Sequence, residues 1–336
     1  MKLLIKISHP AHVHFFKHFI KEMRSEGHEI KVLTTPKNIS IELLEHYDIP
    51  YQSYSHPTNA SKANSQLKLH YETWKLAVEF QPDFLTGIGG TSISHVSTLV
   101  DGKSIIFTDT EDAILQNKLT FPFADNVYTP ECYKEDIGSN QVRYPGYHEL
   151  AYLHPDRFEP DPSVLDYIDA DEKDKIVIVR LSSWDAAHDI QNEGFGDIIS
   201  AVSQLESTGA KVVFTSEKKY PNEIEHCISQ VPIHKIHDLM YYSNLYIGEG
   251  VTMASESAVL GTPSIFISTR KLGYLDELED RYGLVFNFHG EDRQKKGLNK
   301  AVNILNNYDG KKWKNRRKKM LEDKIDVTNL MLHIFS

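Results

Sequence analysis

The feature that most constrains the fold is an alternation of short apolar runs with amphipathic stretches, which occurs twice along the chain. The run LLIKI (Leu3–Ile7) is typical of a buried strand, helical periodicity follows over Phe15–Arg24 until Gly27, and EIKVLTT reads as a second strand. Strand-like runs recur at PDFLTGI, SIIFTD and NVYTP, with a helical stretch over Lys62–Phe80. This order predicts a parallel sheet covered by helices.

The second half repeats the alternation. Its strand-like runs are IVIVRLS, AKVVFTS, NLYIGEG and PSIFIST, with helical intervals at Phe195–Leu205 and Met253–Leu260. A chain of 336 residues exceeds what one hydrophobic core usually supports, so two domains with a cleft between them are expected. The predicted fold class is α/β with two Rossmann-like domains. The expected parts are an N-terminal domain (1–155), a proline-rich and acidic linker (156–174), a C-terminal domain (175–310) and a helix (311–336) that crosses back to the first domain.

Charge and cysteine content exclude several classes of protein. The net charge of -10 would repel a polyphosphate backbone, so no nucleic-acid partner is expected. Cys132 and Cys227 fit neither a disulfide framework nor a metal-ligand spacing, which favours a reducing compartment and inert thiols. The N-terminus carries too short an apolar run for a signal peptide, and no window approaches a membrane span. A cytoplasmic location is therefore predicted.

One strongly basic run, KKWKNRRKKM, occupies residues 311–320 with Trp313 near its centre. A solvated helix face is the first interpretation of such a run. The alternative is contact with anionic lipid head groups at the inner face of a membrane, through residues Lys311 to Lys319.

Each half contains a strand that ends in a glycine cluster and leads into a helix: GIGGTS at 87–92 and GEGVTM at 248–253. Open parallel sheets bind ligands at the carboxyl ends of their strands, where helix N-termini offer free amides. The second cluster could hold a diphosphate, or its glycines could serve tight packing. Glu256 could bind a ribose, or could stabilise the helix dipole. The dinucleotide-binding and P-loop fingerprints are absent from the sequence, which excludes Rossmann dehydrogenases and P-loop NTPases.

The stretch SHPAHVHFF places His9, His12 and His14 directly after the first strand. Three imidazoles could bind a transition metal, but no further ligand pattern supports this. A single imidazole at the mouth of a cleft could instead take a proton from a hydroxyl nucleophile, and a capping or packing role is the remaining alternative. The acidic pair Asp169 and Asp171 reads as part of a solvated loop. No metal and no cofactor are predicted.

Two longer segments together resemble the GT-B superfamily of nucleotide-sugar glycosyltransferases and epimerases. PDFLTGIGGTSISHVSTLVDGKSIIFTDTEDAILQNKLTFPFADNVYTP is similar to the acceptor region of the N-acetylglucosaminyltransferase that makes lipid II, and KIHDLMYYSNLYIGEGVTMASESAVLGTPSIFIS is similar to the donor-binding segment. The nearest likeness is to a prokaryotic family of uncharacterised domains related to that enzyme and to UDP-N-acetylglucosamine 2-epimerase.

The resemblance implies a donor site in the C-terminal domain. Glu256 would hold the ribose hydroxyls, and the backbone of Ile236 and His237 would bracket the base. The implied diphosphate ligands are the amides of Gly250, Val251, Thr252 and Met253, together with Arg180, Ser182 and Ser183. The family's glycines are absent around Arg180.

The resemblance also implies an acceptor site in the N-terminal domain. His12 falls on the histidine that ends the family's first loop and would be the catalytic base, while Pro10 and Ala11 replace glycines of that loop. The residues implied on the acceptor side are His14, Gly89, Gly90, Thr91, Asp109 and Asn117.

The predicted function is transfer of a sugar from a nucleotide donor, UDP-linked by resemblance, to the hydroxyl of a sugar or lipid-linked acceptor, with inversion and without a metal. A first alternative is a UDP-sugar 2-epimerase using Asp109, Glu111 and Asp112, although the family's second helix glutamate is here Ser257. A second alternative is a non-catalytic nucleotide-sugar binding protein. The sequence makes no prediction of oligomeric state.

Overall fold

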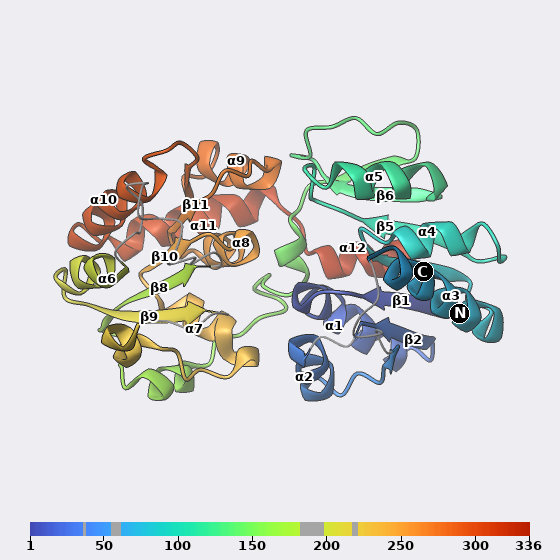
Figure 1. Cartoon of the computed structure of the whole chain (residues 1–336), viewed down its shortest axis with the longest axis horizontal. Coiled ribbons are helices and arrows are strands. Elements are labelled where there is room, and N and C mark those ends of the chain that lie inside the picture. The colour runs from blue at the N-terminus through green and yellow to red at the C-terminus, as the bar shows by residue number, and fades with distance from the viewer. Residues whose placement is uncertain (36–37, 55–61, 182–197, 217–220) are drawn as a thin grey trace. The chain divides into compact units, whose positions relative to one another are not determined.

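The chain folds into two α/β units (Figure 1). The computed structural model describes residues 1–35, 38–54, 62–181, 198–216 and 221–336. Unit 1 comprises Met1–Arg157 and Lys324–Ser336, and unit 2 comprises Phe158–Asp323. Each unit contains one sheet in which every strand pair is parallel, so the predicted α/β class is confirmed.

The sheet of unit 1 has seven strands in the order β3-β2-β1-β4-β5-β6-β7. Its strands are β1 (Lys2–Ile7), β2 (Glu29–Thr34), β3 (Gln52–Ser53), β4 (Phe84–Ile88), β5 (Lys103–Phe107), β6 (Asn126–Pro130) and β7 (Gln141–Tyr144). Its helices are α1 (Pro10–Ser25), α2 (Asn38–His46), α3 (Lys62–Phe80), α4 (Thr91–Ser97), α5 (Ile114–Thr120) and α12 (Val327–Ile334), with the 3-10 helices η1 (Phe121–Phe123) and η2 (His148–Ala151).

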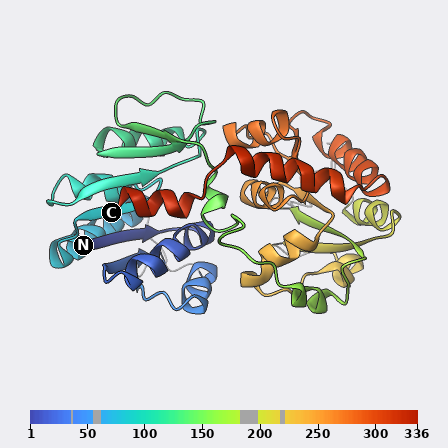
Figure 2. The same ribbon diagram turned by 180° about the vertical axis from the view of Figure 1, so that it is seen from behind.

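Helices cover both faces of this sheet. Figure 2 shows α1 and α12 side by side in front of one face. On the other face, Leu4 of β1 joins a buried cluster with Leu76 of α3 and Val96 of α4. Successive strand residues point to opposite faces, so the unbroken apolar run of β1 fits a strand covered on both sides.

Helix α1 begins at Pro10, five residues before the start expected from periodicity. Proline is favoured at the first helical position because its fixed φ suits the helix and its missing N–H needs no partner there. The side chain of His9 caps the helix by accepting a hydrogen bond from the Ala11 amide, with 3.2 Å between N and Nδ1. Most of the stretch SHPAHVHFF is therefore helical. Its first two residues, Ser8 and His9, connect β1 to α1.

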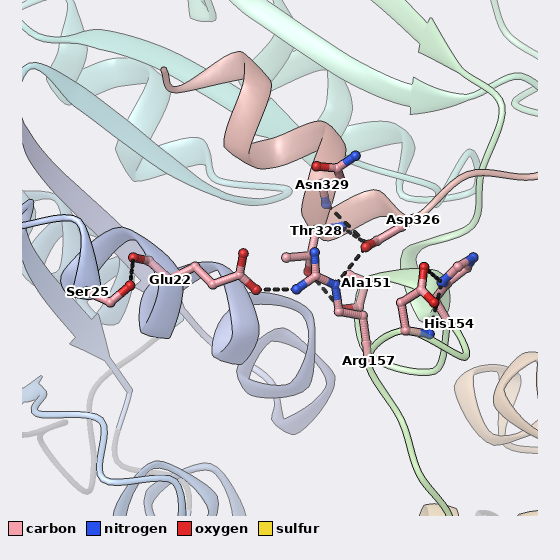
Figure 3. Close-up of polar contacts among 9 residues, drawn as sticks. Glu22, Ser25, Ala151, His154, Arg157, Asp326, Thr328 and Asn329 are labelled. Carbon is pink, nitrogen blue, oxygen red and sulfur yellow. Dashed lines mark hydrogen bonds and ion pairs between the residues drawn. The ribbon is translucent and has the colours of Figure 1, made fainter.

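Arg157 joins the C-terminal segment of the chain to unit 1 (Figure 3). Its guanidinium bonds to Asp326 at 2.6 Å and pairs with Glu22 of α1. Asp326 also caps α12 by accepting from the amides of Thr328 and Asn329. The expected single helix over 311–336 is two helices, one in each unit, because this capped break separates them.

Unit 2 has a five-stranded sheet in the order β12-β11-β10-β8-β9. Its strands are β8 (Lys175–Leu181), β9 (Ala210–Ser216), β10 (Leu245–Gly248), β11 (Ser264–Ile267) and β12 (Val285–Phe288). Its helices are α6 (Ile198–Glu206), α7 (Ile236–Tyr242), α8 (Val251–Leu260), α9 (Gly273–Asp280), α10 (Arg293–Asn306) and α11 (Gly310–Asp323), with the 3-10 helices η3 (Pro162–Ile168), η5 (Asn222–Cys227) and η6 (Ile233–Lys235).

The segment expected as a linker, 156–174, contains η3 and belongs mostly to unit 2. The amide of Asp161 donates to the carboxylate of Asp238 on α7 at 2.9 Å, and the Asp161 carboxylate pairs with Lys235. These contacts fold the acidic stretch against α7.

Much of the basic run in α11 has a structural role. Arg317 donates to the carbonyl of Val259 near the end of α8, and Arg316 donates to the carbonyl of Gly283. Trp313 is 4% exposed and meets the Phe286 ring edge to face. Trp313 is thus a packing residue of unit 2, and the exposed part of the run consists of its lysines and Asn315. Of the helices in the described ranges, none is long and apolar enough to cross a bilayer.

Candidate functional site

A cavity of about 720 Å³ lies at the carboxyl edge of the unit 1 sheet. Its wall includes residues at or just after the ends of four strands: Lys6 in β1 and Ser8 after it, Thr35 after β2, Ile88 in β4 and Gly89 after it, and Thr108 after β5. Residues of α1, α3, α4 and α5 form most of the remaining lining. Ligands of open parallel sheets bind at this edge, so the cavity is the first candidate site of the unit.

His12 lies in the first turn of α1 and lines this cavity. Its Nδ1 accepts a hydrogen bond from the Ser8 amide, at 3.4 Å. Burial lowers the pKa of His12 well below its ordinary value of 6.5, and the neighbouring His9 and Lys6 lower it further. The positive end of the helix dipole acts in the same direction. The ring is therefore neutral at pH 7 and able to take up a proton.

Asp109, predicted on the acceptor side, forms a buried pair with His148 of η2. Its Oδ2 lies 3.1 Å from His148 Nδ1, and its Oδ1 accepts from Thr110 at 2.8 Å. Burial alone would lower the pKa of His148, but the charge and hydrogen bond of Asp109 outweigh burial and raise it. Burial alone would likewise raise the pKa of Asp109, and His148 lowers it. Each group thus favours the charged form of the other, and the Asp109 carboxylate is engaged by His148.

Three more predicted acceptor-side residues line the cavity: Gly89, Thr91 and Asn117. Gly90 is the N-cap of α4. Thr91 shares a hydrogen bond of 2.8 Å with Thr120, and Asn117 donates to the carbonyl of Thr110 at 3.0 Å. The structure therefore brings Gly89, Thr91 and Asn117 together with His12 around one cavity, whereas Gly90 and Asp109 are not part of its lining.

His14 does not lie in the cavity lining. It is 3% exposed, and its ring stacks on Tyr152 at 5.4 Å and meets Tyr47 edge to face at 5.9 Å. Because SHPAHVHFF forms a helix, successive residues turn by about 100° per residue, so His12 and His14 face different directions. The structure therefore does not bring His14 together with the residues of the cavity, and its ring packs in the core.

Lys6, His70 and His95 also line the cavity and were not predicted. The imidazoles of His70 and His95 are joined by a hydrogen bond of 3.1 Å. Their outer nitrogens lie 2.7 Å from the carbonyls of Gln66 and Leu119 respectively. Lys6 could have been suspected from the sequence alone, because it interrupts the apolar run of a buried strand.

In unit 2 the predicted donor loop joins β10 to α8. Gly250 is the N-cap of α8, and no side chain caps this end of the helix. The first amides of a helix have no partner within it, so those of Val251, Thr252 and Met253 are available to an anion. A Cβ at Gly248 would lie 2.2 Å from the carbonyl oxygen of Arg180, so close strand packing requires this glycine.

Arg180 is the second-last residue of the neighbouring strand β8 and lies directly beside Gly248 in the sheet register. A Cβ at Gly250 would lie 3.4 Å from Arg180 Cγ, so the arginine stem runs next to the loop. Of the other predicted donor residues, Ile236 is the first residue of α7, and Ser182 and Ser183 lie outside the described residues. The structure thus brings Arg180 and the α8 N-terminus together.

Glu256 and His237 form a second buried pair. Glu256 Oε1 lies 2.9 Å from His237 Nε2, and the two side chains are 6% and 4% exposed. The sequence suggested only a backbone role for His237, since the resemblance concerned its main chain. The structure adds a side-chain contact that holds the Glu256 carboxylate in place.

Within the described ranges, one group of three side chains has the spacing of a metal site: Glu206, His226 and Cys227. Burial, together with Glu206, raises the pKa of the Cys227 thiol to about 12, so this sulfur is a poor ligand. Glu206 and His226 are both exposed and are already paired at 2.9 Å. These properties fit a surface ion pair better than a metal centre.

Comparison with known proteins agrees with this architecture. The family model described as "Protein of unknown function (DUF354)" matches residues 1–335. The uncharacterized protein MJ0665 of Methanocaldococcus jannaschii is 23% identical over 290 residues, which cover 81% of this chain and 83% of that protein.

Several solved structures are similar in fold. UDP-GlcNAc 2-epimerase from Neisseria meningitidis, bound to UDP-GlcNAc, has a TM-score of 0.68 at 12% identity and covers 99% of both chains. The UDP-GlcNAc 2-epimerase of Methanocaldococcus jannaschii has a TM-score of 0.67 at 13% identity, over 91% of this chain and 93% of that one. The spinosyn forosaminyltransferase SpnP has a TM-score of 0.64 at 12% identity over 100% of both. The predicted GT-B fold is confirmed, and because the family model spans nearly every residue, the chain belongs to the family described as protein of unknown function DUF354.

Proposed function

We propose that the protein is a nucleotide-sugar glycosyltransferase that uses a UDP-linked donor and a hydroxyl acceptor. The observation that carries this proposal is the pairing of two different sites on one GT-B chain. Unit 2 has an uncapped helix N-terminus next to an arginine, which suits a diphosphate. Unit 1 has a cavity with a neutral histidine, which suits a hydroxyl nucleophile.

The donor would be held by its diphosphate and its ribose. The amides at the start of α8 would receive the diphosphate, and Arg180 would add positive charge as the bond to the sugar breaks. The carboxylate of Glu256 would accept hydrogen bonds from the ribose hydroxyls while His237 holds it in place. Since amides and Arg180 would stabilise the leaving group, the reaction is proposed to need no metal ion.

The acceptor would bind in the unit 1 cavity with its hydroxyl against His12. The oxygen forms a bond to the anomeric carbon, the bond from that carbon to the diphosphate breaks, and the hydroxyl proton moves to His12. For this step the ring presents Nε2 as acceptor and carries its own proton on Nδ1. It then gives up the bond from the Ser8 amide, which is weak at 3.4 Å. Attack opposite the leaving group gives inversion.

The proposal is tested by incubating the protein with a panel of UDP-sugars and cell-extract acceptors in the presence of EDTA. We expect acceptor-dependent release of UDP from at least one donor. An isomerised sugar nucleotide formed without acceptor would identify an epimerase instead. UDP binding without any turnover across the panel would identify a binding protein.

The epimerase alternative finds less support among the described side chains. It needs carboxylates poised at the sugar, yet Asp109 is paired with His148. Glu111 accepts a hydrogen bond from the Lys134 amide, and Asp112 is exposed. None of these three belongs to the cavity lining.

Replacing Glu256 by alanine should weaken UDP binding about 10- to 100-fold, because hydrogen bonds to a charged acceptor contribute about 1.5–3 kcal/mol. His237→Ala should weaken it less, since the carboxylate remains but loses a side chain that orients it. Isothermal titration calorimetry with UDP measures both.

The matched control is Glu249→Gln, which removes a negative charge from the same loop at a residue with no assigned contact to UDP. It should leave UDP affinity unchanged or slightly higher. Equal affinity of Glu256→Ala and wild type would remove the ribose assignment.

A further inference from the structure

Lys6 occupies a position where the sheet of unit 1 calls for an apolar side chain. Residues two apart on a strand face the same side, so Lys6 shares a face with Leu4, which lies in the buried cluster under α3 and α4. The other residues of this strand segment, Leu3 to Ile7, are fully buried. Lys6 therefore places an ammonium group near the carboxyl end of β1, on the face that is otherwise buried, and there it lines the cavity.

Gly87 leaves room beside Lys6. The two residues are partners in the pairing of β1 with β4. A Cβ at Gly87 would lie 3.1 Å from the Lys6 carbonyl oxygen and 3.5 Å from Lys6 Cβ, so a larger residue here would crowd the lysine. The glycine thus keeps space open next to the charged side chain.

The cavity lining contains bases and no acid among the described residues. Besides Lys6 it includes His9, His12, His70 and His95, and its other polar side chains are hydroxyls and amides. The stretches 36–37 and 55–61, which the structure does not describe, contain no Asp or Glu either. The whole chain has a net charge of -10, whereas the lining of this cavity has basic side chains and no acidic ones.

Within the described residues, no carboxylate pairs with Lys6, whereas Arg157 and Lys31 of the same unit have carboxylate partners. Arg157 pairs with Glu22 and Asp326, and Lys31 of the neighbouring strand pairs with Glu79. Burial lowers the pKa of Lys6 to about 8, so the group is still mostly an ammonium at pH 7. Lys6 is half-buried, and a charge withdrawn from water in this way without a counter-charge is destabilising unless a ligand supplies one.

His70 and His95 can hold one proton in addition to those of two neutral rings, although burial lowers the pKa of His70 and disfavours this charge while the cavity is empty. The bonds from Gln66 through His70 and His95 to Leu119 need three protons on two rings if all are made at once. The fully bonded pair therefore carries one positive charge, which a bound anion would stabilise.

We propose that the unit 1 cavity binds an oxyanion, a carboxylate or a phosphate of the acceptor, with the Lys6 ammonium as its counter-charge. The proposal rests on the proposed function only in calling this ligand the acceptor. It narrows the acceptor to an anionic molecule, and it assigns to Lys6 a binding role that is separate from proton transfer by His12.

The test measures binding of small probes without UDP and without turnover. Glucuronate and glucose differ in a carboxylate, and inorganic phosphate probes the other oxyanion. Chemical shifts in NMR titrations at pH 7 should show millimolar binding of glucuronate or phosphate, or of both, and much weaker binding of glucose. Binding by glucuronate alone would assign the site to carboxylates, and binding by phosphate alone to phosphates.

Lys6→Met keeps an unbranched side chain but removes the charge, so it should reduce this affinity at least about tenfold. Lys6→Arg keeps the positive charge and should retain the affinity. The matched control Lys31→Met removes a lysine from the adjacent strand outside the cavity and should change nothing. The carboxylate of glucuronate does not titrate near neutral pH, so this probe reports on the protein alone. The affinity of the wild-type protein for glucuronate should fall above about pH 8, as Lys6 loses its proton. The affinity of Lys6→Arg should stay constant over the same pH range. Burial lowers the pKa values of His12 and His70, so neither of these two rings changes its charge in that range.

Equal affinity in Lys6→Met and wild type, equal binding of glucose and glucuronate, or no binding of any probe would overturn the proposal. These outcomes are independent of the transferase reaction. Anion binding through Lys6 with no turnover of any UDP-sugar would support the anion site and refute the proposed function. Acceptor-dependent UDP release without anion binding would support the proposed function and refute the anion site.

Discussion

Replacing His12 by alanine should lower the rate of UDP release about 10²- to 10⁴-fold, the range in which a positioned general base contributes to catalysis. UDP affinity should not change, because the diphosphate and ribose contacts are proposed on unit 2. Steady-state kinetics with the identified donor and acceptor measures the first effect, and calorimetry with UDP the second.

The matched control for His12 is His9→Ala. His9 lines the same cavity and caps α1, so its loss should cost about 1 kcal/mol of stability and change the rate far less. The wild-type rate should stay level from pH 8 down to 6.5, since the depressed pKa keeps His12 unprotonated there, and fall only well below 6.5. An unchanged rate in His12→Ala would exclude this residue as the base.

The α/β class could be predicted because local periodicity and sheet topology agree. Apolar runs such as Leu3–Ile7 become parallel strands, and the helix expected over Lys62–Phe80 has those bounds. Each run carries its own signal, since a strand buried on both faces must be apolar throughout. The order of elements then leaves few topologies.

Boundaries were harder to predict where a single residue decides them. Periodicity missed the first turn of α1 because that turn carries Pro10 and His12 in place of apolar residues, and its start depends on proline geometry and the cap from His9. The break between α11 and α12 depends on the capping and ion pairs of Asp326, which involve Arg157, 169 residues earlier in the chain. Such long-range contacts leave no local pattern.

The candidate site was predictable only in part for the same reason. Gly89, Thr91 and Asn117 follow strands in sequence, so the rule for carboxyl ends of strands finds them. His70 and His95 lie on α3 and α4. Only the packing of these two helices brings His70 Nε2 to 3.1 Å from His95 Nδ1. His148 comes from a 3-10 helix after β7, and its partner Asp109 follows β5. His12 and His14 lie on different faces of α1, so His12 lines the cavity while His14 is buried.

Replacing Asp109 by asparagine should lower the free energy of unfolding by about 3 kcal/mol, the lower end of the range for breaking a buried ion pair, because asparagine can still accept a hydrogen bond from His148. The loss should depend on pH. The pKa of His148 is raised by folding, so its share of the stability is complete below about pH 6.5 and declines as pH rises through the folded value. The pKa of Asp109 is lowered, so its share is complete above about pH 4 and declines in stronger acid. The difference between variant and wild type should thus be largest between about pH 4 and 6.5.

Urea denaturation at pH 5.5 and pH 8.5 measures this difference, and Asp156→Asn provides the matched control. Asp156 pairs with His154 at 3.4 Å in the same unit, but its side chain is 76% exposed, so water already screens the pair. Its loss should cost less than about 1 kcal/mol at either pH. If both variants lost the same stability, burial would not strengthen the Asp109 pair. If the loss in Asp109→Asn were the same at both pH values, His148 would not be held protonated, and the carboxylate would be free to act on a ligand instead of on the imidazole.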